Sequence, residues 1–282
     1  ISRGNGATIG GGEANVCEGW WSIVAGGTAN FIQADADYTT IAGGATNLIQ
    51  ADAKHATISG GGGNVIESDA TFATIAGGEK NLIQADGDFV AIAGGGNNLI
   101  GSDARYSAIS GGQSNIITGG AEYAVIGGGF RNTNRGPAAF LGGGSGNSVS
   151  GPGGTVAGGA GNFSSGAWAS VPGGDRNTAR GAVSLAAGRR AQALHDGAFV
   201  WGDNTEADVA STNATSWTVR ASGGVSFYTA TNLASGASLP AGSGSWSSLS
   251  DRAAKDDVRP VDGRAVLEEL ACLPLSSWRY KT

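Results

Sequence analysis

A short phrase that recurs along the chain constrains its fold more than any other feature. The phrase is an aliphatic residue, then a glycine pair, then an asparagine six positions after the aliphatic residue. It occurs eleven times, and the intervals between copies are six of 17 residues and four of 15. The aliphatic residues are Ile9, Val24, Ile41, Ile58, Ile75, Ile92, Ile109, Ile126, Leu141, Val156 and Val171, and the asparagines are Asn15, Asn30, Asn47, Asn64, Asn81, Asn98, Asn115, Asn132, Asn147, Asn162 and Asn177. A period this short and regular indicates a stack of similar coils.

A coil of 15 to 17 residues is too short for two helices, but it fits two short strands and two turns. The aliphatic residue would lie in one strand, and a second apolar pair, such as Leu48-Ile49 or Leu82-Ile83, would form the other. We expect the glycines to allow close approach between coils and the asparagine to mark a turn in the left-handed conformation. The sequence therefore predicts an all-β fold, a parallel β-solenoid over residues 1–195 that includes a degenerate copy at 185–188. In the longer copies, the two extra residues should bulge outward at one turn.

The 15-residue copies carry a family resemblance. Residues 155–162 (Thr-Val-Ala-Gly-Gly-Ala-Gly-Asn) and 184–193 resemble the head repeats of trimeric autotransporter adhesins, the YadA-like heads. The resemblance covers residues 7–195 and implies a left-handed β-roll, three copies side by side as a homotrimer, and an extracellular location. The small coil points the same way, because it would leave one apolar sheet face uncovered, and symmetric association would cover it.

Composition limits the classes of function. Glycine accounts for 52 of 282 residues, charged residues for only 14%, and the net charge is −6. A nucleic-acid partner is not expected, because it would need a basic stripe. No apolar run approaches the roughly 18 residues of a membrane span. Cys17 occupies a position that is isoleucine in other copies and is interpreted as a core residue, so no disulfide framework and no cofactor are expected.

One column of the repeat is aromatic and is the main candidate for a binding surface. It lies 14 residues after the leading aliphatic residue in the 17-residue copies, and alignment of the turns adds one tryptophan from each of two shorter copies. Its members are Trp21, Tyr38, His55, Phe72, Phe89, Tyr106, Tyr123 and Trp168. Two interpretations stay open: a platform for sugar rings or receptor side chains, and a packing ladder that stabilises contacts between coils.

A column of aspartates suggests three further possibilities. Asp35, Asp52, Asp69, Asp86 and Asp103 lie eleven residues after the leading aliphatic residue. We interpret them as solvated turn residues, because no calcium-loop spacing surrounds them and no metal site is expected. A glycan-degrading enzyme of the tailspike type is kept as an alternative function, although it would need one distinct acid–base pair. A broken column of threonines leaves an ice-binding face as a minor alternative.

The repeat ends before residue 196, and residues 196–249 have a different pattern. Residues 198–202 predict a strand, and residues 216–221 and 224–229 predict a hairpin around Ser222-Gly223. These short β segments hold Trp201, Trp217 and Trp246 and have no evident core of their own. We therefore expect a β neck in which three chains interweave.

Residues 250–282 carry a second family resemblance. A helix is predicted after Asp262, with Val266, Leu267 and Leu270 at helical spacing and Pro274 as its end. The segments Ser-Asp-Arg-Ala-Ala-Lys, Pro-Val-Asp and Leu-Pro-Leu-Ser-Ser-Trp-Arg-Tyr-Lys resemble the start of the intramolecular chaperone domain of phage endosialidases and tail fibres.

This resemblance implies a domain that assembles a trimer and then cuts itself off. The nucleophile would be Ser250, the base Lys255, and the cut would fall before Asp251. The chemistry is reasonable, because a hydroxyl needs a nearby base to attack a peptide bond. We expect no cleavage in this chain, which carries only the start of that domain.

Together, these features predict a trimeric fibre of a cell surface, virion or injection system that attaches to a glycan or protein receptor. A purely structural spacer of a fibre is the remaining alternative.

Overall fold

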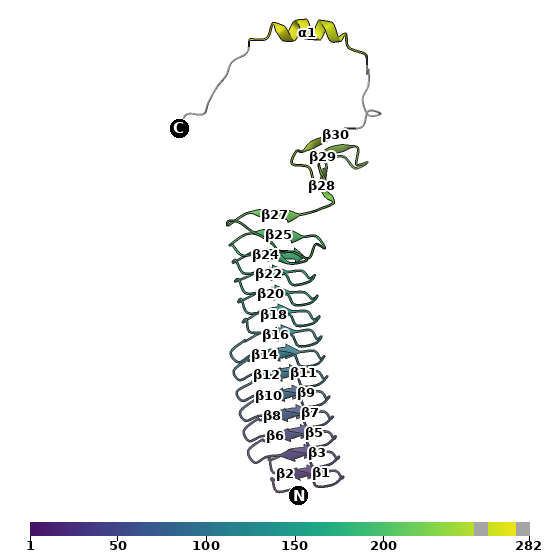
Figure 1. The fold of residues 1–282 in the computed structure, drawn as a ribbon. Coiled ribbons are helices and arrows are strands. Elements are labelled where there is room, and N and C mark those ends of the chain that lie inside the picture. Colours follow the sequence, from purple (N-terminus) through teal and green to yellow (C-terminus); the bar gives the residue numbers. More distant parts are fainter. Residues whose placement is uncertain (251–258, 275–282) are drawn as a thin grey trace. The chain divides into compact units, whose positions relative to one another are not determined.

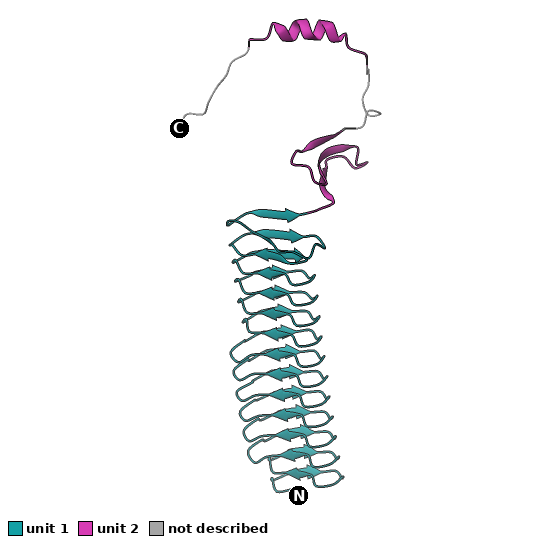
Figure 2. Ribbon diagram, viewed as in Figure 1, with its two compact units in different colours: residues 1–220 teal, residues 221–282 magenta. Residues whose placement is uncertain are grey.

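The computed structural model describes residues 1–250 and 259–274. The chain divides into two units, residues 1–220 and residues 221–282 (Figure 2). The first unit is a parallel β-solenoid of about 13 coils, in which each coil contributes one strand to each of two sheets (Figure 1). The predicted all-β repeat fold is thereby confirmed.

Two long parallel sheets form the walls of the solenoid, and they are named here by the numbering of their strands. The odd sheet contains β1 (Thr8–Ile9), β3 (Ile23–Val24), β5 (Thr40–Ile41), β7 (Thr57–Ile58), β9 (Thr74–Ile75), β11 (Ala91–Ile92), β13 (Ala108–Ile109), β15 (Val125–Ile126), β17 (Phe140–Leu141), β19 (Thr155–Val156), β21 (Ser170–Val171), β23 (Leu185–Gly188), β25 (Phe199–Gly202) and β27 (Trp217–Arg220). The even sheet contains β2 (Val16–Cys17), β4 (Phe31–Ile32), β6 (Leu48–Ile49), β8 (Val65–Ile66), β10 (Leu82–Ile83), β12 (Leu99–Ile100), β14 (Ile116–Ile117), β16 (Thr133–Asn134), β18 (Ser148–Val149), β20 (Phe163–Ser164), β22 (Thr178–Ala179), β24 (Ala191–Ala193) and β26 (Val209–Ala210).

The core is a double row of side chains between the two sheets. Most strands have two residues, and because side chains alternate across a sheet, the first points outward and the second inward. Ile41 on the odd sheet and Ile49 on the even sheet are fully buried, as are their equivalents in the neighbouring coils. Each such burial contributes about 1.5–3 kcal/mol, so the repeated isoleucines explain why these short strands hold together.

The asparagines form a buried ladder along the inside of one turn. The Asn81 side-chain amide donates to the carbonyls of Gly77 at 3.0 Å and of Gly95 in the next coil at 3.1 Å. Its oxygen accepts the backbone N–H of Asn98 at 3.0 Å. Gly78, at φ +90°, lies where a Cβ would fall 2.0 Å from the Gly95 carbonyl oxygen, so only glycine fits there.

The predicted conformation of the asparagines is therefore wrong. The left-handed residue at this turn is the one before each asparagine, such as Thr46 or Lys80, with φ of 55° and 53°. The asparagine is required for its interior side chain, since three buried backbone groups would otherwise lack partners.

The longer coils accommodate their extra residues at the opposite turn. Asp35, Asp52, Asp69, Asp86 and Asp103 all have left-handed φ values between 57° and 65°. Strand pairing continues without a break across the change in coil length, from Ile109 to Ile126 to Leu141. The predicted outward bulge is confirmed, and Figure 1 shows the wider turns on the coils up to β14.

The solenoid continues past residue 195 to Arg220. β25 pairs in parallel with β23, and β27 pairs in parallel with β25 through Phe199↔Trp217 and Gly202↔Arg220. The predicted hairpin between residues 216–221 and 224–229 is wrong, because β27 belongs to the odd sheet and its parallel pairing follows the coils below it.

The second unit contains a three-stranded antiparallel sheet and one helix. The strands β28 (Gly224–Tyr228), β29 (Ser235–Pro240) and β30 (Ser247–Ser250) pair in that order. The helix α1 (Gly263–Ala271) begins after Asp262, whose carboxylate accepts the Arg264 backbone N–H at 3.0 Å, as the sequence predicts. Across the described residues, no helix combines the length and hydropathy needed to cross a membrane.

Candidate functional site

The predicted aromatic column lies at the turn that leads from the even sheet into the odd sheet. Each aromatic residue has a left-handed φ, for example 60° at Tyr38 and 58° at Phe72, and the residue after it points into the core. Its backbone N–H donates to a carbonyl of the preceding coil, as from Phe72 to Lys54 at 2.9 Å. A left-handed conformation favours glycine and disfavours large side chains. The aromatic residues therefore occupy this position at a conformational cost that their side chains must offset.

Six of the eight predicted aromatic residues stack into one continuous ladder. Ring centroids lie 4.8–5.3 Å apart and ring planes differ by 5–8°. The six residues are Tyr38, His55, Phe72, Phe89, Tyr106 and Tyr123. Aromatic pairs contribute about 0.5–1.5 kcal/mol each beyond their buried area, so five consecutive pairs offset much of the conformational cost.

The two tryptophans occupy the same place in the coil but lie outside this stack. The ring of Trp21 covers Gly6, and the ring of Trp168 covers Gly153, so that a Cβ on either glycine would fall within 3 Å of ring atoms. Trp168 follows Tyr123 by three coils, and Ala138 and Gly153 occupy the two positions between them.

The stacking decides what the ladder can offer to a ligand. A sugar or a receptor side chain that binds by stacking needs a free ring face. In the ladder, each inner ring has both faces against its neighbours, and only its edge reaches solvent. The geometry thus supports the packing interpretation for the inner rings.

The aspartate column faces solvent along the adjacent bulge. Aspartate tolerates the left-handed conformation better than most residues, which explains why it recurs there. No group of three or more histidine, cysteine, aspartate or glutamate side chains suited to a metal ion occurs in the described part of the chain.

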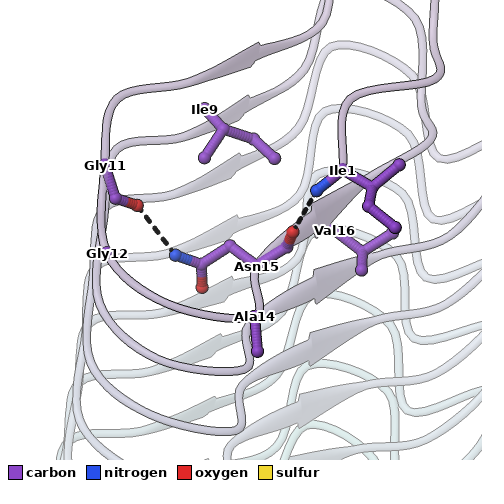
Figure 3. A pocket seen from close by; sticks show the side chains of 7 residues that line it. All are labelled: Ile1, Ile9, Gly11, Gly12, Ala14, Asn15 and Val16. Atoms are coloured by element: carbon purple, nitrogen blue, oxygen red, sulfur yellow. Dashed lines mark hydrogen bonds between the residues drawn. The ribbon is translucent and has the colours of Figure 1, made fainter.

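Two hollows lie in the first unit, and neither contains a pair of carboxylates. One, of about 510 Å³, opens at the first coil, where Asn15 donates to the Gly11 carbonyl at 2.9 Å (Figure 3). It is lined by Ile1, Ile9, Gly11, Gly12, Ala14, Asn15 and Val16. The other, of about 400 Å³, contains one carboxylate, that of Asp203, which accepts from Arg220 Nε at 2.8 Å. Neither hollow has the two carboxylates of a glycosidase.

A cluster of charged side chains near the last coils was not anticipated from the sequence. Glu206, in the loop between β25 and β26, accepts from Arg176 at 3.0 Å and from Arg190 at 3.1 Å, and it also pairs with Arg189. Arg190 Nε reaches Asp208 at 2.7 Å. The signal was the Arg-Arg pair at 189–190 followed by an acidic loop, but only the coil register brings the two together.

The residues predicted for self-cleavage are only partly covered. Ser250 ends β30, where its backbone pairs with that of Ser235. Asp251 and Lys255 lie outside the described residues. Of the cysteines, Cys17 is fully buried as predicted, and burial raises the pKa of its thiol.

Comparison with known proteins finds no matching family model and no significant match among curated proteins. The function must therefore be argued from the residues and their geometry.

Proposed function

We propose that this chain is part of a homotrimeric extracellular fibre that attaches to a surface, built from left-handed rolls that continue into an interwoven neck. One observation carries the proposal. The outward-facing positions of the even sheet are apolar in seven consecutive coils, and each of these side chains is only partly buried. They are Val16, Phe31, Leu48, Val65, Leu82, Leu99 and Ile116, named here the even-sheet stripe.

The even-sheet stripe is long enough to serve as an interface. At ~4.8 Å per coil, seven side chains span roughly 30 Å. A continuous apolar strip of this length on a soluble protein marks an interaction surface. A second and third copy of the chain supply such a cover by rotational symmetry, which is the usual symmetry of soluble oligomers.

A pair of variants in one coil tests this interface. Leu82→Glu places a carboxylate in the middle of the even-sheet stripe, whereas Ala91→Glu places the same carboxylate on the outer face of the odd sheet, where Ala91 is exposed. Light scattering should show that Leu82→Glu weakens the trimer and that Ala91→Glu leaves it intact. Equal masses for both variants and the wild type would place the interface elsewhere.

The carboxy-terminal segment supports a second part of the proposal, that a self-cleaving chaperone assembles the fibre. The support is the resemblance around Ser250, Asp251 and Lys255. In a chain extended beyond residue 282, mass spectrometry should detect release of the segment that begins at Asp251, and Ser250→Ala should abolish it. Release from both proteins would remove this assignment.

A further inference from the structure

The aromatic ladder is interrupted directly after Tyr123. The backbone positions that continue it are Ala138 and Gly153, and the next is Trp168, all with left-handed φ between 54° and 62°. Their N–H groups keep the ladder's hydrogen bonds, for example from Ala138 to the Glu122 carbonyl at 2.8 Å. The coil geometry is therefore unchanged where the rings are missing.

The missing rings leave one open level rather than two. The Trp168 ring lies against Gly153, since a Cβ there would fall 2.3 Å from the nearest ring atom. This ring fills the level of Gly153, and only the level of Ala138 lacks one. Tyr123 and Trp168 are 57% and 68% exposed, so the slot between them opens to solvent. This slot, formed by Tyr123, Ala138 and Trp168, is named here the ladder gap.

The size of the ladder gap matches one six-membered ring. Neighbouring rings of the ladder lie 4.8–5.3 Å apart, which is one coil per ring. The gap occupies one such level, and the face of Tyr123 that points toward Ala138 has no ring of the described chain against it. The gap thus offers what the inner ladder does not, a free aromatic face.

The charge around the ladder gap selects an uncharged occupant. Along the ladder, the residue before each aromatic ring is often charged, as at Asp37, Lys54, Asp88 and Arg105. At the gap, the equivalent residues are Pro137 and Pro152. The coils also shorten from 17 to 15 residues here, so the acidic bulge ends below the gap.

We propose that the ladder gap binds a neutral pyranose ring of a surface glycan. The C–H face of a pyranose ring packs on the electron-rich face of an aromatic ring, and Tyr123 and Trp168 provide one on each side. This inference rests on the proposed attachment function and names its ligand class. In a homotrimer, three gaps at one height would bind a glycan-coated surface with avidity.

Filling the gap tests the proposal. Ala138→Trp places a ring at the open level, and Ala29→Trp makes the same change at another exposed alanine with the same φ of 54°. Saturation-transfer NMR and titration would use neutral hexose and N-acetylhexosamine trisaccharides, sialylated trisaccharides of equal length, and the peptide Gly-Trp-Gly. Neutral trisaccharides should bind the wild type and Ala29→Trp alike, and bind Ala138→Trp and Tyr123→Ala at least tenfold more weakly.

Three results would overturn the proposal: no binding of neutral trisaccharides, binding of only the sialylated sugars or the peptide, or undiminished binding by Ala138→Trp. Light scattering on the same samples separates this outcome from failure of the proposed function. A trimer that binds no neutral sugar refutes the ladder gap alone, whereas a monomer refutes the fibre. None of the substituted residues belongs to the even-sheet stripe.

Discussion

The wide coils between Val24 and Ile126 and the narrow coils between Ile126 and Val171 share one backbone scheme and differ in what fills it. In the wide coils, isoleucine points inward from both sheets and every coil carries an aromatic ring at the turn. In the narrow coils, the inward residues of the even sheet shrink to Asn134, Val149 and Ser164, and the ladder breaks. The asparagine ladder runs through both regions with the same hydrogen bonds.

The difference teaches which parts of the repeat are required and which are variable. The asparagine, the glycine pair and the strand register are common to both regions, so they define the coil. Core volume and turn length change together, because a coil with two fewer residues encloses less space. The outer columns vary most and can therefore carry recognition.

The asparagine ladder should be equally necessary in both regions. Asn81→Ala in a wide coil and Asn162→Ala in a narrow coil each leave two carbonyls and one N–H of buried backbone without partners. Each should lower the free energy of unfolding by about 3 kcal/mol or more. Urea denaturation would measure both, and a narrow-coil variant that retains wild-type stability would show that the two regions are held differently.

Core truncation should separate the regions. Ile83→Ala removes a large, fully buried side chain from a wide coil and should cost about 2–5 kcal/mol. Val149→Ala at the equivalent place in a narrow coil removes less volume and should cost roughly 2 kcal/mol. Hydrogen exchange of the adjacent strands would report each loss locally, and a larger effect in the narrow coil would contradict the account.

The ladder should show a reversal between alanine and glycine. Phe72→Ala removes two ring contacts but keeps a Cβ at φ 58°, and should cost about 1–2 kcal/mol. Phe72→Gly removes the same contacts and relieves the left-handed strain, so it should be less destabilising by about 0.5–1 kcal/mol. Thermal unfolding of both variants tests this order, and a glycine variant that is less stable than the alanine variant would refute the strain argument.

The aspartate bulge should contribute least. Asp69 lies in a row of carboxylates spaced at about one coil, where like charges repel weakly in water. Asp69→Asn keeps a residue that tolerates φ 58° and should stabilise the wide coils by a few tenths of a kcal/mol at low salt. The gain should vanish in 1 M salt; a loss of stability at low salt would mean that Asp69 has a specific partner.

The sequence predicts the coil well because its period records the stacking directly. The strand positions, the outward bulge and the buried Cys17 all follow from which residues recur at which place. The role of the asparagines was missed, since their spacing does not reveal whether the left-handed residue is the asparagine or the one before it. The ladder gap was also hidden, because the column in the sequence includes Trp168 but does not show that the ring lies over Gly153. The Glu206 cluster depends on a loop whose path the repeat does not specify.

The native mass of the chain tests the central claim, that the even-sheet stripe makes this protein a trimer. Sedimentation equilibrium over a range of concentrations should give three times the chain mass of 27.7 kDa, about 83 kDa. A single species of 27.7 kDa at all concentrations would contradict the proposed fibre.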